Sequence, residues 1–322
     1  MVITGASSGI GLATARRAAK QGARVVLAAR NGEVLEAIEA EIVQAGGAAI
    51  HVVADVGRRE DVQRIADTAI GHFGRIDTWV NDAGLSIFGR LEEVSDTDHQ
   101  KLFQTNFWGV VYGSLAAVPH LKRSGGVLIN LGSVASDVAF PLQGMYCASK
   151  HAIKGFTDSL RIELEEEGAP VSVTLIKPAA INTPFPQHAR NYTDREPKLP
   201  PPIYDPREVA VAILHAAEHP QRDIYVGGGG RVMSTVQAMA PRAFDRIGRL
   251  MVGQQVRTER PRNPAGALHA AGIDGQVRGD HPGYVMRRSF YTRATIHPAA
   301  TGLVLAAGVA AAMALMHRTG RR

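Results

Sequence analysis

The chain is poor in cysteine and has no pattern typical of an export signal. Cys147 is its only cysteine, so a disulfide within the chain and a zinc site built on cysteines are both excluded. The 12 histidines are scattered without the spacing of metal ligands, and we expect no metal site. A single cysteine and a start that opens almost directly into a strand and a glycine-rich turn favour a cytoplasmic location.

Lysine and acidic residues are also scarce towards the C-terminus. Between Arg231 and Arg322 there are 14 arginines, no lysine and 4 acidic residues, a net charge of +10 within a total of +6. Residues 1–230 are therefore slightly acidic, at −4. A slightly acidic body does not suggest a nucleic-acid enzyme, whereas an arginine-only tail suggests contact with an anionic membrane surface or a partner.

Short apolar runs alternate with helix-like segments along residues 1–230. The runs predict buried parallel strands, and the repeated strand–helix units predict an α/β fold with helices on both faces of one sheet. The expected strands are Val2–Ile3, Arg24–Ala28, Ala48–Val53, Asp77–Val80, Gly126–Leu131, Val171–Ile176 and Asp223–Val226. The expected helices are Ile10–Gln21, Glu33–Ala45, Arg59–Phe73 and Pro206–Glu218. The first strand is short, so we expect it either to be weaker than usual or to begin upstream of Met1.

A glycine-rich turn follows the first expected strand and opens the first expected helix. Glycine lets the backbone turn tightly and approach a pyrophosphate, while a helix N-terminus supplies free N–H groups and a favourable dipole. Such turns also occur in ordinary loops, but a strand before and a helix after favour dinucleotide binding. The expected contacts are Thr4, Gly5, Ser7, Ser8, Gly9, Ile10 and Gly11.

No acidic residue stands at the end of the second strand, where Asp or Glu would bind the 2′-hydroxyl of the adenosine ribose. The strand ends in Ala29-Arg30-Asn31 instead. An acidic group would repel a 2′-phosphate, whereas the Arg30 guanidinium pairs with it in a bidentate way. We therefore expect NADP(H) in preference to NAD(H). The alternative is that Arg30 is a solvated residue at the start of a loop.

Tyr146 and Lys150 are four residues apart, which places them on one face of a helix. An ammonium near a phenol favours the phenolate, so we expect the pKa of Tyr146 to fall towards working pH. Ser133 follows the strand that ends at Leu131, at the sheet edge where open α/β folds bind ligands. A Tyr–Lys pair at this spacing is common by chance, but chance is a poor account of all three features together.

Residues 1–230 resemble the short-chain dehydrogenase/reductase family in its single-domain branch. Several motifs occur in the family's order: Thr4–Gly11 is similar to its cofactor turn, Asp55-Val56 to the pair that contacts adenine, and Asn81-Asp82-Ala83-Gly84 to its Asn-Asn-Ala-Gly motif. Pro178–Thr183 resembles the segment that packs on the nicotinamide, with Ala179 in place of the usual glycine. The further cofactor contacts that the resemblance implies are Asp55, Val56, Asn81, Ala83, Gly84, Tyr146, Lys150, Pro178, Ile181 and Thr183.

The resemblance also implies a fold, a mechanism and an assembly. The fold is a Rossmann-type, doubly wound parallel sheet of about seven strands in the order 3-2-1-4-5-6-7. In the mechanism NADPH delivers a hydride to a carbonyl carbon, and Tyr146 gives the oxygen its proton. Ser133 steadies the alkoxide, Lys150 binds the nicotinamide ribose, and Asn106 holds a water of the proton relay. The implied assembly is a homodimer or homotetramer, built partly from the helices within Leu91–Leu121 and Tyr146–Glu167.

The substrate is expected to be hydrophobic, because the loops within Val138–Met145 and Phe185–Pro202 are mainly apolar. A carbonyl or alcohol of lipid-like, steroid-like or aromatic character suits them. Two other functions remain open. One is a non-catalytic NADP-binding sensor or scaffold that docks through its tail, and the other is epimerisation or dehydration on the same fold.

Residues 231–297 form a basic, amphipathic extension of helical and irregular segments. Apolar residues from Val232 to Met251 recur at helical spacing with arginines between them, and Pro241 is expected to split this stretch into two short helices. These helices pack on their own domain, form a subunit interface or lie on a membrane surface. Residues 257–293 look rich in loops and weakly ordered. Residues 298–316 lack charge and are a candidate membrane anchor, with a soluble helix or a disordered tail as alternatives.

Overall fold

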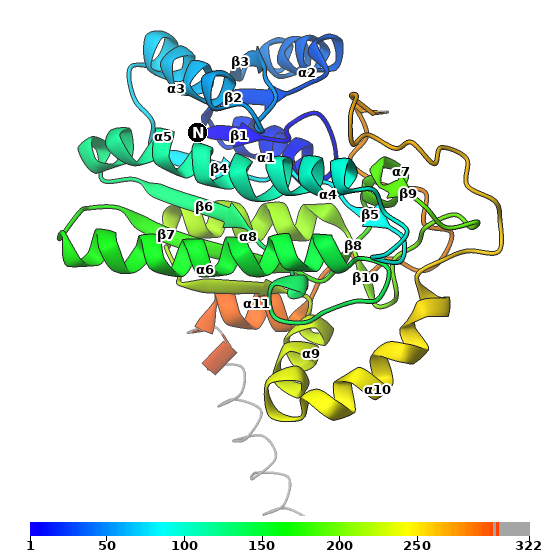
Figure 1. Ribbon diagram of the computed structural model, residues 1–322. Coiled ribbons are helices and arrows are strands. Elements are labelled where there is room, and N and C mark those ends of the chain that lie inside the picture. Colours follow the sequence, from blue (N-terminus) through cyan, green and yellow to red (C-terminus); the bar gives the residue numbers. More distant parts are fainter. Residues whose placement is uncertain (273, 299–300, 303–322) are drawn as a thin grey trace, which may run out of the picture.

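The computed structural model describes residues 1–272, 274–298 and 301–302, and a parallel seven-stranded sheet lies at its centre (Figure 1). The strands lie in the order β11-β7-β6-β4-β1-β2-β3, which is 3-2-1-4-5-6-7 when these seven are counted along the chain. This confirms the predicted Rossmann-type sheet. Their bounds are β1 (Val2–Thr4), β2 (Arg24–Ala29), β3 (Ala48–Val53), β4 (Thr78–Asn81), β6 (Val127–Leu131), β7 (Ser172–Pro178) and β11 (Asp223–Val226).

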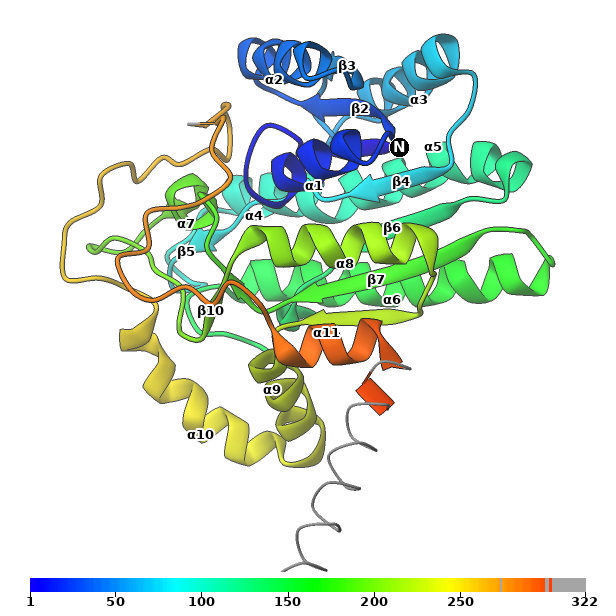
Figure 2. The ribbon, with the colours of Figure 1, turned by 180° about the vertical axis from the view of Figure 1, so that it is seen from behind.

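Helices cover both faces of the sheet, as Figures 1 and 2 show from opposite sides. Leu12, Leu35 and Ile213 belong to the apolar layer on one face, and Ile65, Leu121 and Leu164 to the layer on the other. The first layer is formed by α1 (Gly9–Lys20), α2 (Gly32–Gln44) and α8 (Pro206–Glu218), and the second by α3 (Arg59–Phe73), α5 (Gly109–Ser124) and α6 (Gly144–Glu166).

The first strand is short, yet it lies in the middle of the sheet. β1 pairs with β2 on one side and with β4 on the other, and Val2 and Ile3 are fully buried. The Met1 ammonium adds a hydrogen bond to the Arg24 carbonyl (2.8 Å). Three residues are therefore enough to carry the glycine-rich turn to the carboxyl edge of the sheet.

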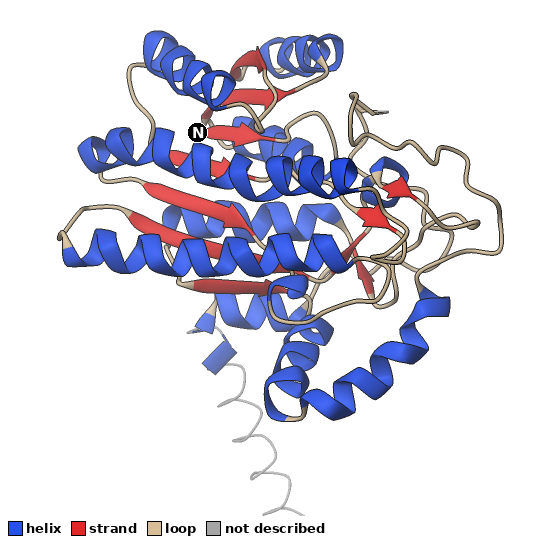
Figure 3. Cartoon of the chain, viewed as in Figure 1, coloured by secondary structure: helices blue, strands red, loops and turns tan. Residues whose placement is uncertain are grey.

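Small elements gather at that carboxyl edge (Figure 3). Two short parallel pairs join β5 (Ile87–Phe88) to β9 (Arg190–Asn191) and β8 (Ala180–Ile181) to β10 (Ile203–Tyr204). They frame α7 (Phe185–His188) and the end of α4 (Asp96–Phe103), after which one π-helical turn (Gln104–Trp108) leads into α5. π-helical turns are frequent at functional sites, and this one contains Asn106.

The basic extension begins with two helices, as predicted, and they meet at Pro241. They are α9 (Gly228–Met239) and α10 (Pro241–Met251). The Asp137 carboxylate joins α9 to the body, because it accepts hydrogen bonds from the hydroxyls of Ser234 (3.1 Å) and Tyr225 (2.6 Å). α10 faces the body with Phe244 and leaves Leu250 exposed.

After α10 the chain is rich in loops, as predicted, but it is not detached from the body. It runs along the carboxyl edge of the sheet and returns to α11 (Phe290–Ile296), which lies against β11 (Figures 1 and 2). Leu268, within this stretch, is fully buried. Most of the candidate anchor, residues 298–316, lies outside the described residues. Among the residues that are described, no helix is long and apolar enough to cross a membrane.

Candidate active site

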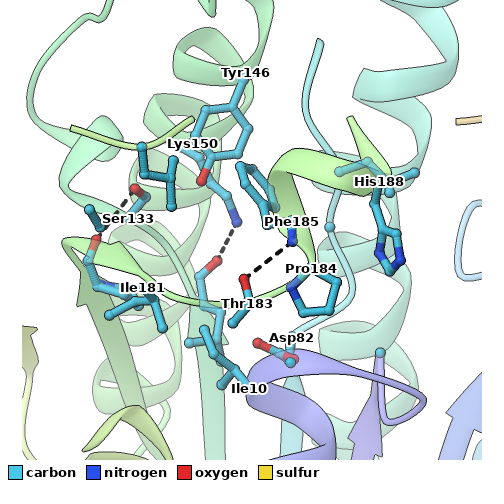
Figure 4. Close-up of a pocket in the computed structure, with 18 of the residues that line it drawn as sticks. Ile10, Asp82, Ser133, Tyr146, Lys150, Ile181, Thr183, Pro184, Phe185 and His188 are labelled. Atoms are coloured by element: carbon cyan, nitrogen blue, oxygen red, sulfur yellow. Dashed lines mark hydrogen bonds between the residues drawn. The ribbon is translucent and has the colours of Figure 1, made fainter. Parts of the chain in front are cut away.

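A cavity of about 310 Å³ opens at the carboxyl edge of the sheet. Most of the residues predicted from the sequence line it, from both the catalytic set and the cofactor set. They are Gly5, Ser7, Ser8, Gly9, Ile10, Arg30, Asp55, Val56, Ala83, Gly84, Ser133, Tyr146, Lys150, Pro178, Ile181 and Thr183. Figure 4 shows Ser133, Tyr146 and Lys150 grouped together, with Phe185 beside the tyrosine ring.

The glycine-rich turn packs tightly against the chain after β4. Gly5 has φ +72°, and a Cβ there would lie 2.9 Å from the backbone of Ala83. Only glycine fits this combination of a left-handed conformation and a close approach. Ser8 is the N-cap of α1, and its side chain makes no capping hydrogen bond. Ser8, Gly9 and Ile10 line the cavity, so the first turn of α1 lies where a pyrophosphate site is expected.

Thr4, Gly11 and Asn81 lie behind the cavity wall. The Thr4 hydroxyl donates to the Val80 carbonyl (3.3 Å) and accepts from the Asp82 N–H (3.1 Å). The Asn81 amide donates to the Asn130 side chain (2.9 Å). These bonds join the ends of β1, β4 and β6. A direct contact of the three residues with a cofactor stays a prediction.

Arg30 faces the nucleotide end of the cavity, but it is not a solvated loop residue. Its guanidinium donates to the carbonyls of Ala267 (2.5 Å) and Leu268 (3.3 Å), which belong to the C-terminal extension. Beside it, the Asp55 carboxylate accepts from Lys101 (2.8 Å) and from the Gly57 N–H (2.9 Å). The extension therefore takes part in the region predicted to bind adenosine.

The catalytic candidates come from two elements that meet at the cavity. Tyr146 and Lys150 lie one turn apart on α6, and Ser133 caps a short 3₁₀ turn after β6. The Ser133 hydroxyl accepts the Ala135 N–H (3.1 Å), donates to the Pro178 carbonyl (3.5 Å) and interacts with the Tyr146 phenol. The Lys150 ammonium lies 5.8 Å from the centre of the tyrosine ring and donates to the Leu131 carbonyl (2.7 Å).

The pKa of Tyr146 differs from the expectation. Burial raises it above its ordinary value, and the hydrogen bond with Ser133 only partly offsets this. Burial also lowers the pKa of Lys150 to about 8, while the nearby charge of Asp82 acts in the opposite direction. Desolvation has the largest effect on both groups because both are enclosed by protein, and the charges of Cys147 and Asp82 raise the pKa of Tyr146 further. Tyr146 is consequently protonated at neutral pH, which suits a proton donor.

Asn106 is fully buried next to the catalytic helix. Its amide accepts from the Leu85 N–H (2.8 Å), donates to the Leu85 carbonyl (2.9 Å) and donates to the Ser149 hydroxyl (3.1 Å). These bonds fix the side chain between the chain after β4 and α6. Its predicted role in holding a relay water stays a prediction.

Asp82 is the functional candidate that the sequence reading left without a role. Its carboxylate accepts the Gly11 N–H, and burial raises its pKa to about 7. It lines the cavity near Lys150. In the sequence, the one feature that could have indicated a role for Asp82 is its acidic side chain within the Asn81–Gly84 motif. Asp82 and Lys150 thus form a carboxylate–ammonium pair in which both groups have pKa values near neutral pH.

Replacing Asp82 by asparagine is expected to move the pH dependence of cofactor binding. Lys150 is expected to hold the nicotinamide ribose in its charged form, so NADPH affinity should fall as pH rises through about 8. Asp82→Asn removes the charge that favours the ammonium, so this fall should move to lower pH. NADPH affinity measured against pH checks this, with Asp67→Asn on the exposed side of α3 as control. The same midpoint in all three proteins would contradict the coupling.

The chain after β7 forms the wall opposite the glycine-rich turn. Ala179, in place of the family's usual glycine, lies where Gly227 and Gly230 leave room, since a Cβ on those glycines would come within 2.9 Å and 3.2 Å of its side chain. Pro178 and Ile181 on either side line the cavity. The two neighbouring glycines therefore make room for alanine at position 179.

The substrate end of the cavity is mainly apolar. Phe140, Phe185 and Leu199 come from the predicted loops, and Met233 and Met251 come from α9 and α10. Two paired amides add polarity, because Gln143 donates to Gln255 (2.6 Å). The sequence did not indicate that residues of the extension line this cavity, because no local pattern shows that the extension folds back over the sheet edge.

A parallel Rossmann sheet with Ser, Tyr and Lys at its carboxyl edge is the architecture of a dinucleotide-dependent oxidoreductase. The short chain dehydrogenase family model matches residues 1–193, and the chain belongs to this family of oxidoreductases. An uncharacterised oxidoreductase of Bacillus subtilis, YxnA, is 49% identical over 98% of this chain and 90% of its own length. That match extends through the C-terminal extension.

Two further relatives have more specific names. The 11-beta-hydroxysteroid dehydrogenase A of Sesamum indicum is 40% identical over 58% of this chain and 53% of its own. The structure of an alcohol dehydrogenase from Thermococcus sibiricus, complexed with 5-hydroxy-NADP, is similar with a TM-score of 0.62 and 30% identity. The similarity covers 70% of this chain and 94% of that one.

Proposed function

We propose that the protein is an NADP(H)-dependent oxidoreductase that interconverts a hydrophobic carbonyl compound and its alcohol. The observation that carries this proposal is the shared cavity. Ser133, Tyr146 and Lys150 lie at one end, and the glycine-rich turn and Arg30 lie at the other. A dinucleotide that spans the two would bring its reactive ring to the catalytic group.

The residues that line the cavity suit each part of an NADP(H) molecule. The first turn of α1 suits the pyrophosphate, Arg30 a 2′-phosphate, and Asp55 with Val56 the adenine. Pro178, Ile181 and Thr183 offer the nicotinamide an apolar wall with one hydroxyl. When bound, NADPH supplies the hydride that the protein cannot.

The side chains of the protein position the substrate and move the proton. Ser133 donates a hydrogen bond to the substrate oxygen and steadies the negative charge that develops there. Tyr146, which is protonated at neutral pH, gives that oxygen its proton. Lys150 holds the nicotinamide ribose and favours the phenolate left on Tyr146. Asn106, fixed by Leu85 and Ser149, returns a proton from solvent through water.

The walls of the substrate end support a hydrophobic substrate. Phe140, Phe185, Met233 and Met251 surround it with apolar groups, and methionine adapts to irregular shapes. The names of the relatives from sesame and Thermococcus sibiricus, a hydroxysteroid dehydrogenase and an alcohol dehydrogenase, are consistent with a reaction at CH–OH.

The test is oxidation of NADPH, compared with NADH, over a panel of apolar ketones and aldehydes. Turnover with a preference for NADPH is expected. Tight NADPH binding without turnover of any carbonyl would favour the alternative, an NADP-binding sensor or scaffold docked through its tail.

The assembly and the tail add two smaller proposals. Trp108 and Leu115 on the π turn and α5, and Ile162 on α6, are exposed apolar residues, which supports a homodimer or homotetramer through these helices. On α10, Ile247 and Leu250 are exposed among arginines, which supports contact with an anionic membrane. Light scattering and vesicle sedimentation test the two separately.

A further inference from the structure

A segment of the C-terminal extension crosses the nucleotide end of the cavity. We name residues 267–272 and 274–279 the strap. Ala267, Ala271, Gly272 and Asp274 line the cavity beside Arg30 and the glycine-rich turn. Figure 1 shows the part of the extension between α10 and α11 as a gold-to-orange loop at the carboxyl edge of the sheet.

Backbone hydrogen bonds join the strap to the glycine-rich turn. The Gly275 N–H donates to the Ser7 carbonyl (2.8 Å), and the Gly9 N–H donates to the Gln276 carbonyl (2.9 Å). Further along, the Gly279 N–H donates to the Asn182 carbonyl (3.2 Å) on the nicotinamide side. The strap therefore contacts both walls between which a dinucleotide would lie.

The strap also holds Arg30, the residue predicted to bind the 2′-phosphate. Arg30 donates one hydrogen bond from each terminal nitrogen, to Ala267 and to Leu268. A guanidinium has five N–H donors in a rigid planar fork, so donors remain for a phosphate after these two bonds. The carbonyls of the strap would then hold the Arg30 guanidinium in place while its remaining N–H groups contact the 2′-phosphate.

We propose that the strap is a wall of the nucleotide site and orients Arg30, so that its docking determines how strongly the protein prefers NADP(H) to NAD(H). The proposal rests on the proposed function. The new element is that the cofactor specificity depends on a segment far from Arg30 in the sequence. Ala267, to which Arg30 is bonded, lies 237 residues further along the chain.

An ion pair outside the cavity offers a way to loosen the strap. Arg278 donates two hydrogen bonds to Asp205, the buried N-cap of α8 (2.9 and 2.5 Å). Neither residue lines the cavity. A matched pair holds a different part of the extension to the same helix, since Arg293 on α11 donates to the buried Glu208 (2.9 and 2.8 Å). Arg278→Ala and Arg293→Ala thus each remove the arginine partner of one buried carboxylate at the start of α8.

The experiment measures dissociation rates of NADPH and NADH by stopped-flow fluorescence in wild type, Arg278→Ala and Arg293→Ala. In Arg278→Ala we expect NADPH to dissociate about tenfold faster or more, a loss equivalent to roughly 1.4 kcal/mol. The NADH rate should change less, so that the preference for NADPH shrinks. Arg293→Ala should keep the preference of the wild type.

Gly275→Ala gives a second variant that leaves the ion pair intact. Gly275 has φ +88°, so a side chain there strains the strap at its bond to Ser7. We expect the same selective rise in NADPH dissociation. Wild-type preference in both strap variants would overturn the role of the strap while leaving the proposed function standing. A wild type that binds NADPH no better than NADH would instead overturn the proposed cofactor preference, and the role of the strap with it.

Discussion

Replacing Tyr146 by phenylalanine should lower kcat for carbonyl reduction by about 10²- to 10⁴-fold, the usual share of general acid catalysis. The phenol lies beside Ser133 and Lys150, and its raised pKa keeps it protonated at neutral pH, as a proton donor must be. The ring is kept in Tyr146→Phe, so the contact with Phe185, whose ring centre lies 5.3 Å away, survives. NADPH affinity is therefore expected to stay near that of the wild type.

The control for this prediction removes a hydroxyl elsewhere. Tyr112→Phe on α5 does so outside the set of residues that line the cavity and should keep the wild-type kcat. Steady-state rates and NADPH binding measured on the three proteins separate chemistry from binding. A Tyr146→Phe enzyme with wild-type kcat would remove Tyr146 from the mechanism.

Replacing Arg30 by glutamine should raise the Kd of NADPH by about 10- to 100-fold, the factor expected when charged hydrogen bonds to a phosphate are lost. Glutamine keeps an NH2 group, so an uncharged N–H donor remains at position 30 for the carbonyls of the strap. NADH lacks the 2′-phosphate, and its Kd should change little. The result is a protein whose preference between the two cofactors is largely lost.

Fluorescence titration of both cofactors checks the role of Arg30, with Arg58→Gln as control. Arg58 is an exposed cation before α3, and its loss changes the net charge by the same amount without touching the cavity. If Arg58→Gln weakened NADPH as much as Arg30→Gln did, the preference would come from net charge rather than from a specific contact.

Much of the fold could be predicted because its signals are local. The buried strands are continuous apolar runs, and α3 and α8 have helical periodicity, with Gly74 ending α3 and Asp205 capping the start of α8. Pro241 splits the amphipathic stretch where predicted. The spacing of Tyr146 and Lys150 likewise follows from one turn of helix. These features depend on residues close in sequence, so the sequence is sufficient to predict them.

The rest depends on contacts between distant residues. Nothing near Arg30 indicates that its partners are carbonyls of Ala267 and Leu268, because a loop without periodicity carries no sign of where it packs. The pKa of Tyr146 was predicted from one neighbour, whereas its burial, which depends on the whole cavity, has the larger effect. The hydrogen bonds by which Thr4 and Asn81 join the ends of neighbouring strands likewise link residues far apart in the sequence, and their contact with a cofactor stays a prediction.

Isotope labelling shows whether hydride passes from NADPH to a carbonyl in this cavity. NADPH that carries deuterium on the reactive face of the nicotinamide is incubated with the protein and apolar ketones, and the alcohols are analysed by mass spectrometry. We expect deuterium on the carbinol carbon with wild type and almost none with Tyr146→Phe. NADPH that binds tightly while no carbonyl acquires deuterium, alike in both proteins, would contradict hydride transfer.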